Sequence, residues 1–180
     1  MNTGVDIALM SHRSTYLGAL RSAKTEPRVA RLRAQLAAAD DPAAWLPFAR
    51  AAVDAKLRKQ SILLQRLNRR DTDPIVVASV NQIDHMISMI PQATDREGLM
   101  GLEGAAARAY FVAVGCLIPE PLRFAVRSRR PPQDLINAAL SFGYALLLGE
   151  ATAAAVAAGL EPNAGSIPVG VTHRSYAAGF

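Results

Sequence analysis

Apolar residues recur three and four positions apart over most of the chain, which predicts a series of amphipathic helices. Proline, glycine and acidic residues interrupt this pattern, so five helices are expected rather than one long one. They are expected from Glu26–Pro27 to Asp40, from Pro42 to about Arg69, over Ile75–Ile90, from Thr94 to about Gly115, and over about Gln133–Ala158. Their predicted inward positions are Val29, Leu32 and Leu36 in the first helix, Leu46, Ala49, Val53, Leu57, Leu64 and Leu67 in the second, and Val76, Val80, Ile83 and Ile87 in the third.

The residues at the helix ends support these limits. Asp41 is a suitable N-cap with Pro42 in the first helical position. Thr94 is expected to cap the fourth helix, with Glu97 three residues later as its capping-box partner. Gly159 is expected to end the fifth helix in the left-handed conformation that glycine adopts without strain.

Only the first twenty residues have the character of strands. Residues 5–11 and 15–20 are expected to pair across a tight turn at 12–14. An isolated hairpin is marginal in water, so it is interpreted as the remnant of an N-terminal β-domain. The predicted fold class is mainly α, a helical bundle preceded by this hairpin. The expected divisions are 1–25 for the β remnant, 26–165 for the helical domain and 166–180 for an irregular tail.

Composition agrees with a globular protein, since 51% of the 180 residues are hydrophobic and 19% are charged. The single cysteine, Cys116, excludes an internal disulfide and fits a reducing cytoplasm, the predicted location. The fifth helix is apolar enough to resemble a membrane span. Its uncharged run, Leu135–Gly149, has only 15 residues, fewer than the ~20 that a bilayer requires. A buried core helix is the preferred interpretation, and no membrane partner is expected.

Positive charge is concentrated in residues 28–70, where ten basic residues accompany three acidic ones. The basic residues are Arg28, Arg31, Arg33, Arg50, Lys56, Arg58, Lys59, Arg66, Arg69 and Arg70. Such a segment is typical of phosphate-binding surfaces, and equally of a solvated helix face.

Polar side chains on two of the apolar helices are the main candidates for chemistry. Glu103 and Tyr110 share a face of the fourth helix, and Asn137, Ser141 and Tyr144 share a face of the fifth. If the two faces meet, they form a small polar pocket whose oxygen ligands suit Mg²⁺ or Mn²⁺. The alternatives are that Glu103 complements the helix dipole and that the Asn and Ser side chains bond nearby backbone.

The loop between these helices contains four arginines that either form a phosphate clamp or only keep the surface soluble. They are Arg123, Arg127, Arg129 and Arg130. No Ser–His–Asp pattern, Walker loop, dinucleotide fingerprint or paired-cysteine zinc motif is present.

Several motifs in fixed order carry a family resemblance. They are GLEGAAARAYF, F-x-x-R-x-R-R-P-P-x-D, INAALSFGYALL and GLEP-x-x-G, preceded by AAVDAKLRKQSILLQR. Over about residues 5–165 the chain resembles the CRISPR-associated endonuclease/integrase of the spacer-acquisition (adaptation) complex, the Cas1 family. Lys59 stands where an asparagine is usual.

The resemblance implies a β-rich N-terminal domain joined to a helical catalytic domain, a homodimer, and assembly with a small partner dimer. The implied activity is cleavage of DNA and integration of foreign fragments into a repeat array, dependent on Mg²⁺ or Mn²⁺. Glu103 matches the metal-binding glutamate, and Tyr110, Asn137, Ser141 and Tyr144 match residues around the site. The residues expected to hold DNA are Arg58, Lys59, Arg66, Arg123, Arg129 and Arg130.

The chain departs from the family pattern after GLEP-x-x-G. The aligned position of the second metal ligand, a histidine, holds Pro168, and no acidic residue follows Glu161 to supply the third. We therefore expect a family member truncated at both ends, with one metal ligand of three and impaired activity. The alternatives are a non-catalytic DNA-binding or assembly fragment, and a decayed remnant without function.

Overall fold

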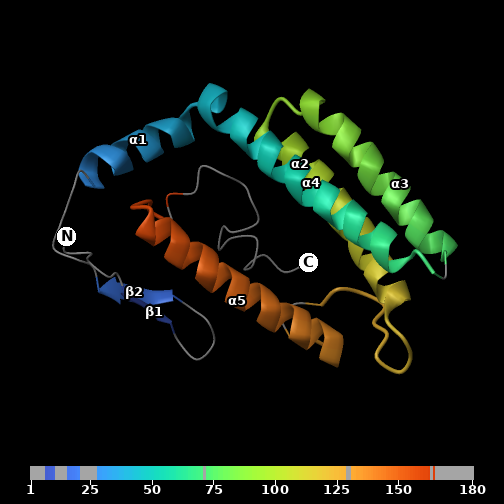
Figure 1. Cartoon of the computed structure of the whole chain (residues 1–180). Helices are drawn as coiled ribbons and strands as arrows, with labels where there is room; N and C mark the ends of the chain where they lie inside the picture. The colour runs from blue at the N-terminus through green and yellow to red at the C-terminus, as the bar shows by residue number, and fades with distance from the viewer. Residues whose placement is uncertain are drawn as a thin grey trace.

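The computed structural model describes residues 7–10, 16–20, 28–70, 72–128, 131–162 and 164. The elements are β1 (Ile7–Met10), β2 (Tyr16–Leu20), α1 (Arg28–Asp40), α2 (Pro42–Leu67), α3 (Pro74–Met89), a 3₁₀ turn η1 (Ile90–Gln92), α4 (Arg96–Leu117) and α5 (Leu135–Ala157) (Figure 1). The mainly helical fold and the five predicted helices are confirmed. The predicted hairpin turn at 12–14, Arg129, Arg130, Pro168 and the predicted tail lie outside the described residues.

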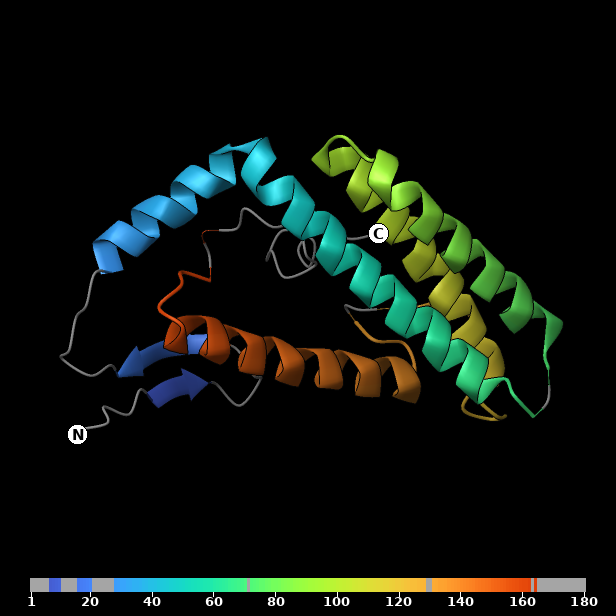
Figure 2. The same ribbon diagram turned by 45° about the horizontal axis from the view of Figure 1, so that its top comes forward.

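The core lies among α2, α3 and α4. These three helices run side by side, with α5 running apart from them (Figure 2). Leu57 and Leu64 of α2, Ile83 of α3 and Leu99 of α4 are fully buried. Facing them, α4 presents alanines, whose small side chains let the helices approach closely. The predicted inward positions of α3 are all buried. The prediction that Leu67 faces inward is wrong, because this residue is 55% exposed at the last turn of α2.

Acidic N-caps fix the starts of the core helices. The Asp41 carboxylate accepts the Ala43 N–H at 2.9 Å, as predicted. The cap of α4 is Asp95, which accepts the Gly98 N–H at 2.8 Å, so the assignment of Thr94 was wrong by one residue. A carboxylate at this position also interacts favourably with the helix dipole, which a threonine hydroxyl does less strongly.

The apolar stripe predicted for α1 is not buried by the described residues. Val29 is 65% exposed and Leu36 46% exposed. Polar contacts with the end of α5 hold α1 instead: Arg31 Nη1 donates to the Ala158 carbonyl at 3.0 Å, and Gln35 donates to the Glu161 carbonyl at 2.9 Å. Helical spacing shows that one face is apolar, but not that the same chain covers it.

The expectation that α5 is a buried core helix is also wrong. Phe142 is 62% and Leu147 63% exposed, although Gly159 ends the helix in the left-handed conformation as predicted. The N-cap of α5 is Asp134, which was not predicted from the sequence. By length and composition alone, both α4 and α5 could cross a membrane. Of the two, α4 contributes several buried residues to the helical core.

Gly115 provides a test of how α4 packs against the following loop. A Cβ at this position would lie 2.9 Å from the Phe124 backbone oxygen, closer than side chains pack. We expect Gly115→Ala to lower the free energy of unfolding by about 1–3 kcal/mol, because the loop backbone must move. Gly101→Ala is the matched control on the same helix, where a Cβ meets open space, and should stabilise by about 0.5–1 kcal/mol. Urea unfolding measures both, and equal effects would contradict this packing.

Candidate functional site

Glu103 forms an ion pair with Lys56. The packing of α2 against α4 brings the two side chains together, and Lys56 Nζ donates to Glu103 Oε1. Glu103 lies about two turns into α4, beyond the first turn where a helix dipole acts most strongly. The helix dipole therefore does not account for a carboxylate at this position. Its ion pair with Lys56 across the α2–α4 interface does. Lys56 was not among the predicted site residues.

The described residues do not fit a divalent metal site. Among them, no group of three His, Cys, Asp or Glu side chains could hold an ion. A Mg²⁺ or Mn²⁺ ion that catalyses phosphodiester chemistry needs several fixed oxygen ligands. Among the described residues Glu103 belongs to no such set of ligands. Its carboxylate already accepts a hydrogen bond from the Lys56 ammonium group.

Two predicted site residues on different helices lie close enough to interact electrostatically. Burial raises the pKa of the Tyr110 phenol, and the neighbouring Tyr144 phenol raises it further. The Tyr110 ring also meets the Phe111 ring edge-on, with centroids 5.2 Å apart. Tyr110 and Tyr144 thus influence each other electrostatically, although α5 otherwise runs apart from α4.

Asn137 and Ser141 of α5 form hydrogen bonds with Arg127 in the loop between α4 and α5. Arg127 donates to Asn137 Oδ1 at 2.9 Å and to Ser141 Oγ at 3.1 Å. Fully buried Asn137 also donates to the Val126 carbonyl at 3.0 Å, and the Arg127 guanidinium lies 5.7 Å from the Phe111 ring centroid. Arg127 thus joins the loop to α5 and α4, a role that the phosphate-clamp interpretation did not anticipate. The described residues show no hydrogen bond from Asn137 or Ser141 to Glu103.

The residues predicted to hold DNA differ in whether their charged groups already have partners within the described part of the chain. Lys59 and Arg66 are exposed on α2 and, within the described part of the chain, make no ion pair. Arg58 pairs with Asp54 at 2.6 Å, and this carboxylate raises the pKa of Arg58. Arg123 donates to the Ile118 carbonyl at 3.3 Å, so it partly serves to close the end of α4. Arg129 and Arg130 lie outside the described residues.

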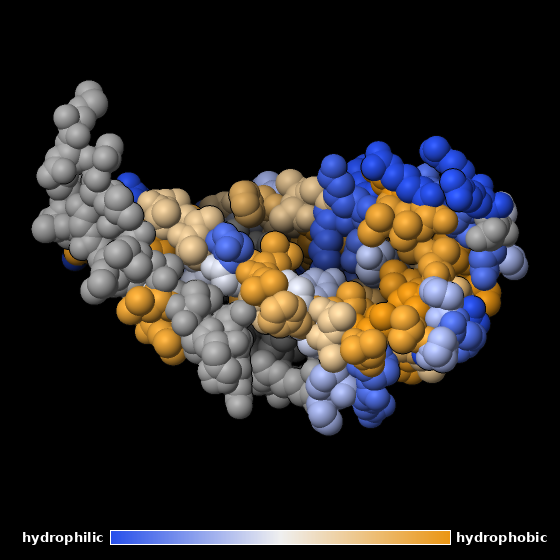
Figure 3. Space-filling view, turned by 60° about the horizontal axis from the view of Figure 1, so that its bottom comes forward, coloured by the Kyte–Doolittle hydropathy of each residue, from blue (hydrophilic) through white to orange (hydrophobic). Residues whose placement is uncertain are grey.

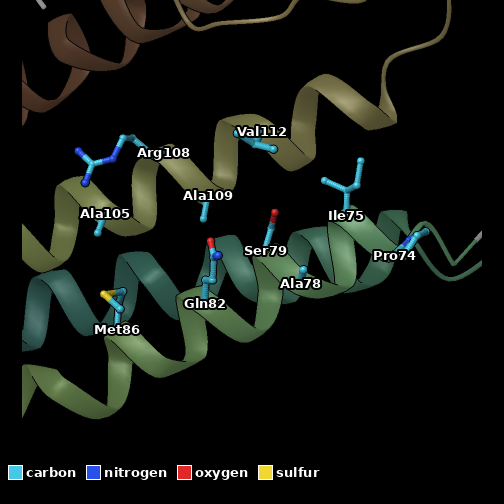
Figure 4. Close-up of a pocket in the computed structure, with 10 residues that line it drawn as sticks. All are labelled: Pro74, Ile75, Ala78, Ser79, Gln82, Met86, Ala105, Arg108, Ala109 and Val112. Atoms are coloured by element: carbon cyan, nitrogen blue, oxygen red, sulfur yellow. The ribbon is translucent and has the colours of Figure 1, made fainter.

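The surface combines apolar and hydrophilic areas. On the face drawn in Figure 3, hydrophobic residues gather in the middle, and hydrophilic residues border them at one end of the molecule. A separate groove of about 760 Å³ lies between α3 and α4 (Figure 4). Ile75, Val112 and Met86 make it mainly apolar, and Arg108 projects at its edge. None of the predicted site residues lines this groove.

Comparison with known proteins gives a consistent family. The family described as "CRISPR associated protein Cas1" matches residues 1–174. A CRISPR-associated endonuclease Cas1 of Thermus thermophilus is 40% identical over 150 residues, covering 83% of this chain and 43% of the relative. The Mycobacterium tuberculosis CRISPR-associated endonuclease Cas1 is 35% identical over 142 residues, covering 79% of this chain and 41% of the relative.

A solved structure has the same fold. A chain of a partial Cas6-RT-Cas1–Cas2 complex superposes with a TM-score of 0.76 at 27% identity, covering 91% of this chain and 49% of that one. The present chain therefore spans about half the length of the proteins it matches. The family match over residues 1–174 and the fold of the solved structure agree, and the chain belongs to the Cas1 family of CRISPR-associated proteins.

Proposed function

We propose that this chain is the helical part of a spacer-acquisition integrase, and that by itself it binds DNA without cleaving it. The observation that carries the DNA-binding half is the exposed basic side of α2. Lys59 and Arg66 lie two helical turns apart on this side, and Arg69 and Arg70 follow directly after the helix. Basic side chains without acidic neighbours are available to neutralise backbone phosphates.

The catalytic half of the proposal follows from the surroundings of Glu103. Relatives named as endonucleases support a nuclease ancestry, and the family suggests a divalent metal. We propose Mg²⁺ or Mn²⁺ as that metal. Among the described residues no group of three ligands accompanies the Glu103 carboxylate, which accepts a hydrogen bond from Lys56. We infer that the chain alone has little or no metal-dependent cleavage activity.

The proposed partners are DNA fragments and the repeat array, a second copy of the chain, and a small partner dimer of the Cas2 type, in the cytoplasm. Solved complexes in which Cas1 occurs with Cas2 support the last of these. An assembly role is the second candidate, favoured by the exposed apolar residues of α5, including Phe142 and Leu147. Light scattering over a range of concentrations tests it, and a strictly monomeric chain would weigh against self-assembly.

The dependence of DNA affinity on salt tests the binding half of the proposal. Phosphate contacts release counterions, so log K should fall linearly with log salt, with a slope of about −2 to −4 for two to four contacts. Fluorescence anisotropy with a labelled duplex between 50 and 200 mM salt measures this slope. An affinity that does not change with salt would contradict a phosphate-binding surface on α2.

A further inference from the structure

The pair formed by Lys56 and Glu103 has consequences beyond DNA binding. Both side chains are partly sheltered, with 39% of the Lys56 and 27% of the Glu103 side chain exposed. Lys56 precedes Leu57, which is fully buried, so the core fixes the backbone from which the ammonium group reaches α4. The pair is therefore held by helix packing rather than formed by two freely moving surface side chains.

An ammonium group and a divalent cation compete for the same carboxylate lone pairs. A positive charge within one hydrogen-bond length of the carboxylate neutralises it and repels a second cation. Among the described residues no further cluster of acidic, histidine or cysteine side chains surrounds the pair to compensate for this repulsion. The family pattern assigns the Glu103 carboxylate to metal binding, but in this chain it is already paired with the Lys56 ammonium group.

We propose that Lys56 is the resident counter-ion of Glu103 and keeps divalent cations away from this carboxylate in this chain. Lys56 lies outside the set of predicted site residues. The test of this proposal contains no DNA, so the proposal can fail without affecting the proposed DNA binding, and the reverse also holds.

The test is a Mn²⁺ titration of the 180-residue chain, observed by paramagnetic broadening of backbone amide signals around Glu103. We expect Lys56→Met, which keeps most of the length of the side chain but removes its charge, to lower the Mn²⁺ concentration for half-maximal broadening about tenfold. Lys59→Met is the matched control, because it removes the same charge from the same helix, three residues from Lys56. It should leave the broadening around Glu103 close to wild type.

Two further variants complete the experiment. Lys56→Arg retains the charge and should behave as wild type, whereas Lys56→Met combined with Glu103→Gln should lose the broadening at this position. If Lys56→Met does not give a native amide spectrum, Lys56→Gln takes its place with the same expectation. Equal Mn²⁺ responses in wild type and Lys56→Met, or a Lys56→Arg variant that gains Mn²⁺ binding, would overturn the proposal.

Discussion

Replacing Lys59 and Arg66 together by glutamine is expected to weaken DNA binding by about one to two orders of magnitude at 50 mM salt. Both side chains are exposed on α2, so the fold should be retained. Each lost phosphate contact should reduce the salt slope by about one, so the double variant should lose about two from it. Fluorescence anisotropy at several salt concentrations measures the affinity and the slope in one experiment.

The control for this variant removes two positive charges from other exposed places. Arg33 on α1 and Arg108 at the edge of the α3–α4 groove are both exposed and lie outside the proposed DNA surface. Their joint replacement by glutamine should change the slope by much less than one. If both double variants lose affinity equally, net charge rather than the α2 surface would govern binding.

The largest effect on stability is expected from Leu57→Ala. Leu57 is fully buried in the core formed by α2, α3 and α4. The free energy of unfolding should fall by about 2–5 kcal/mol, from lost burial together with the cavity. Urea unfolding followed by far-UV circular dichroism gives this value.

Leu67→Ala is the matched control on the same helix. The sequence pattern places both leucines on one stripe, but Leu67 is 55% exposed. Its replacement should therefore cost no more than about 1 kcal/mol, since little apolar area is lost. A Leu67→Ala variant as unstable as Leu57→Ala would contradict this, because it would mean that the Leu67 side chain is buried.

Local signals in the sequence were sufficient to locate the helices along the chain. Asp41 and Gly159 act through atoms within a few residues, so their roles follow from spacing. Leu36 of α1 and Phe142 of α5 show where such reasoning ends. Periodicity reveals an apolar face but contains no information on which surface, in this chain or another, covers it.

The candidate site shows the same limit. The motif around Glu103 marked the carboxylate, but its ion pair with Lys56 joins positions 47 residues apart and depends on how α2 packs on α4. The bonds from Arg127 to Asn137 and Ser141 likewise depend on the path of the connecting loop. Contacts of this kind are set by tertiary structure and leave no mark in residue spacing.

The most direct measurement is one assay that reads binding and cleavage together. The chain is incubated with branched DNA and Mn²⁺, and the mixture is divided between a native gel for complexes and a denaturing gel for products. A retarded complex without cleavage or strand-transfer product is the predicted result, with Glu103→Gln indistinguishable from wild type. Products that form with wild type and disappear with Glu103→Gln would contradict the proposal that the chain alone binds DNA without cleaving it.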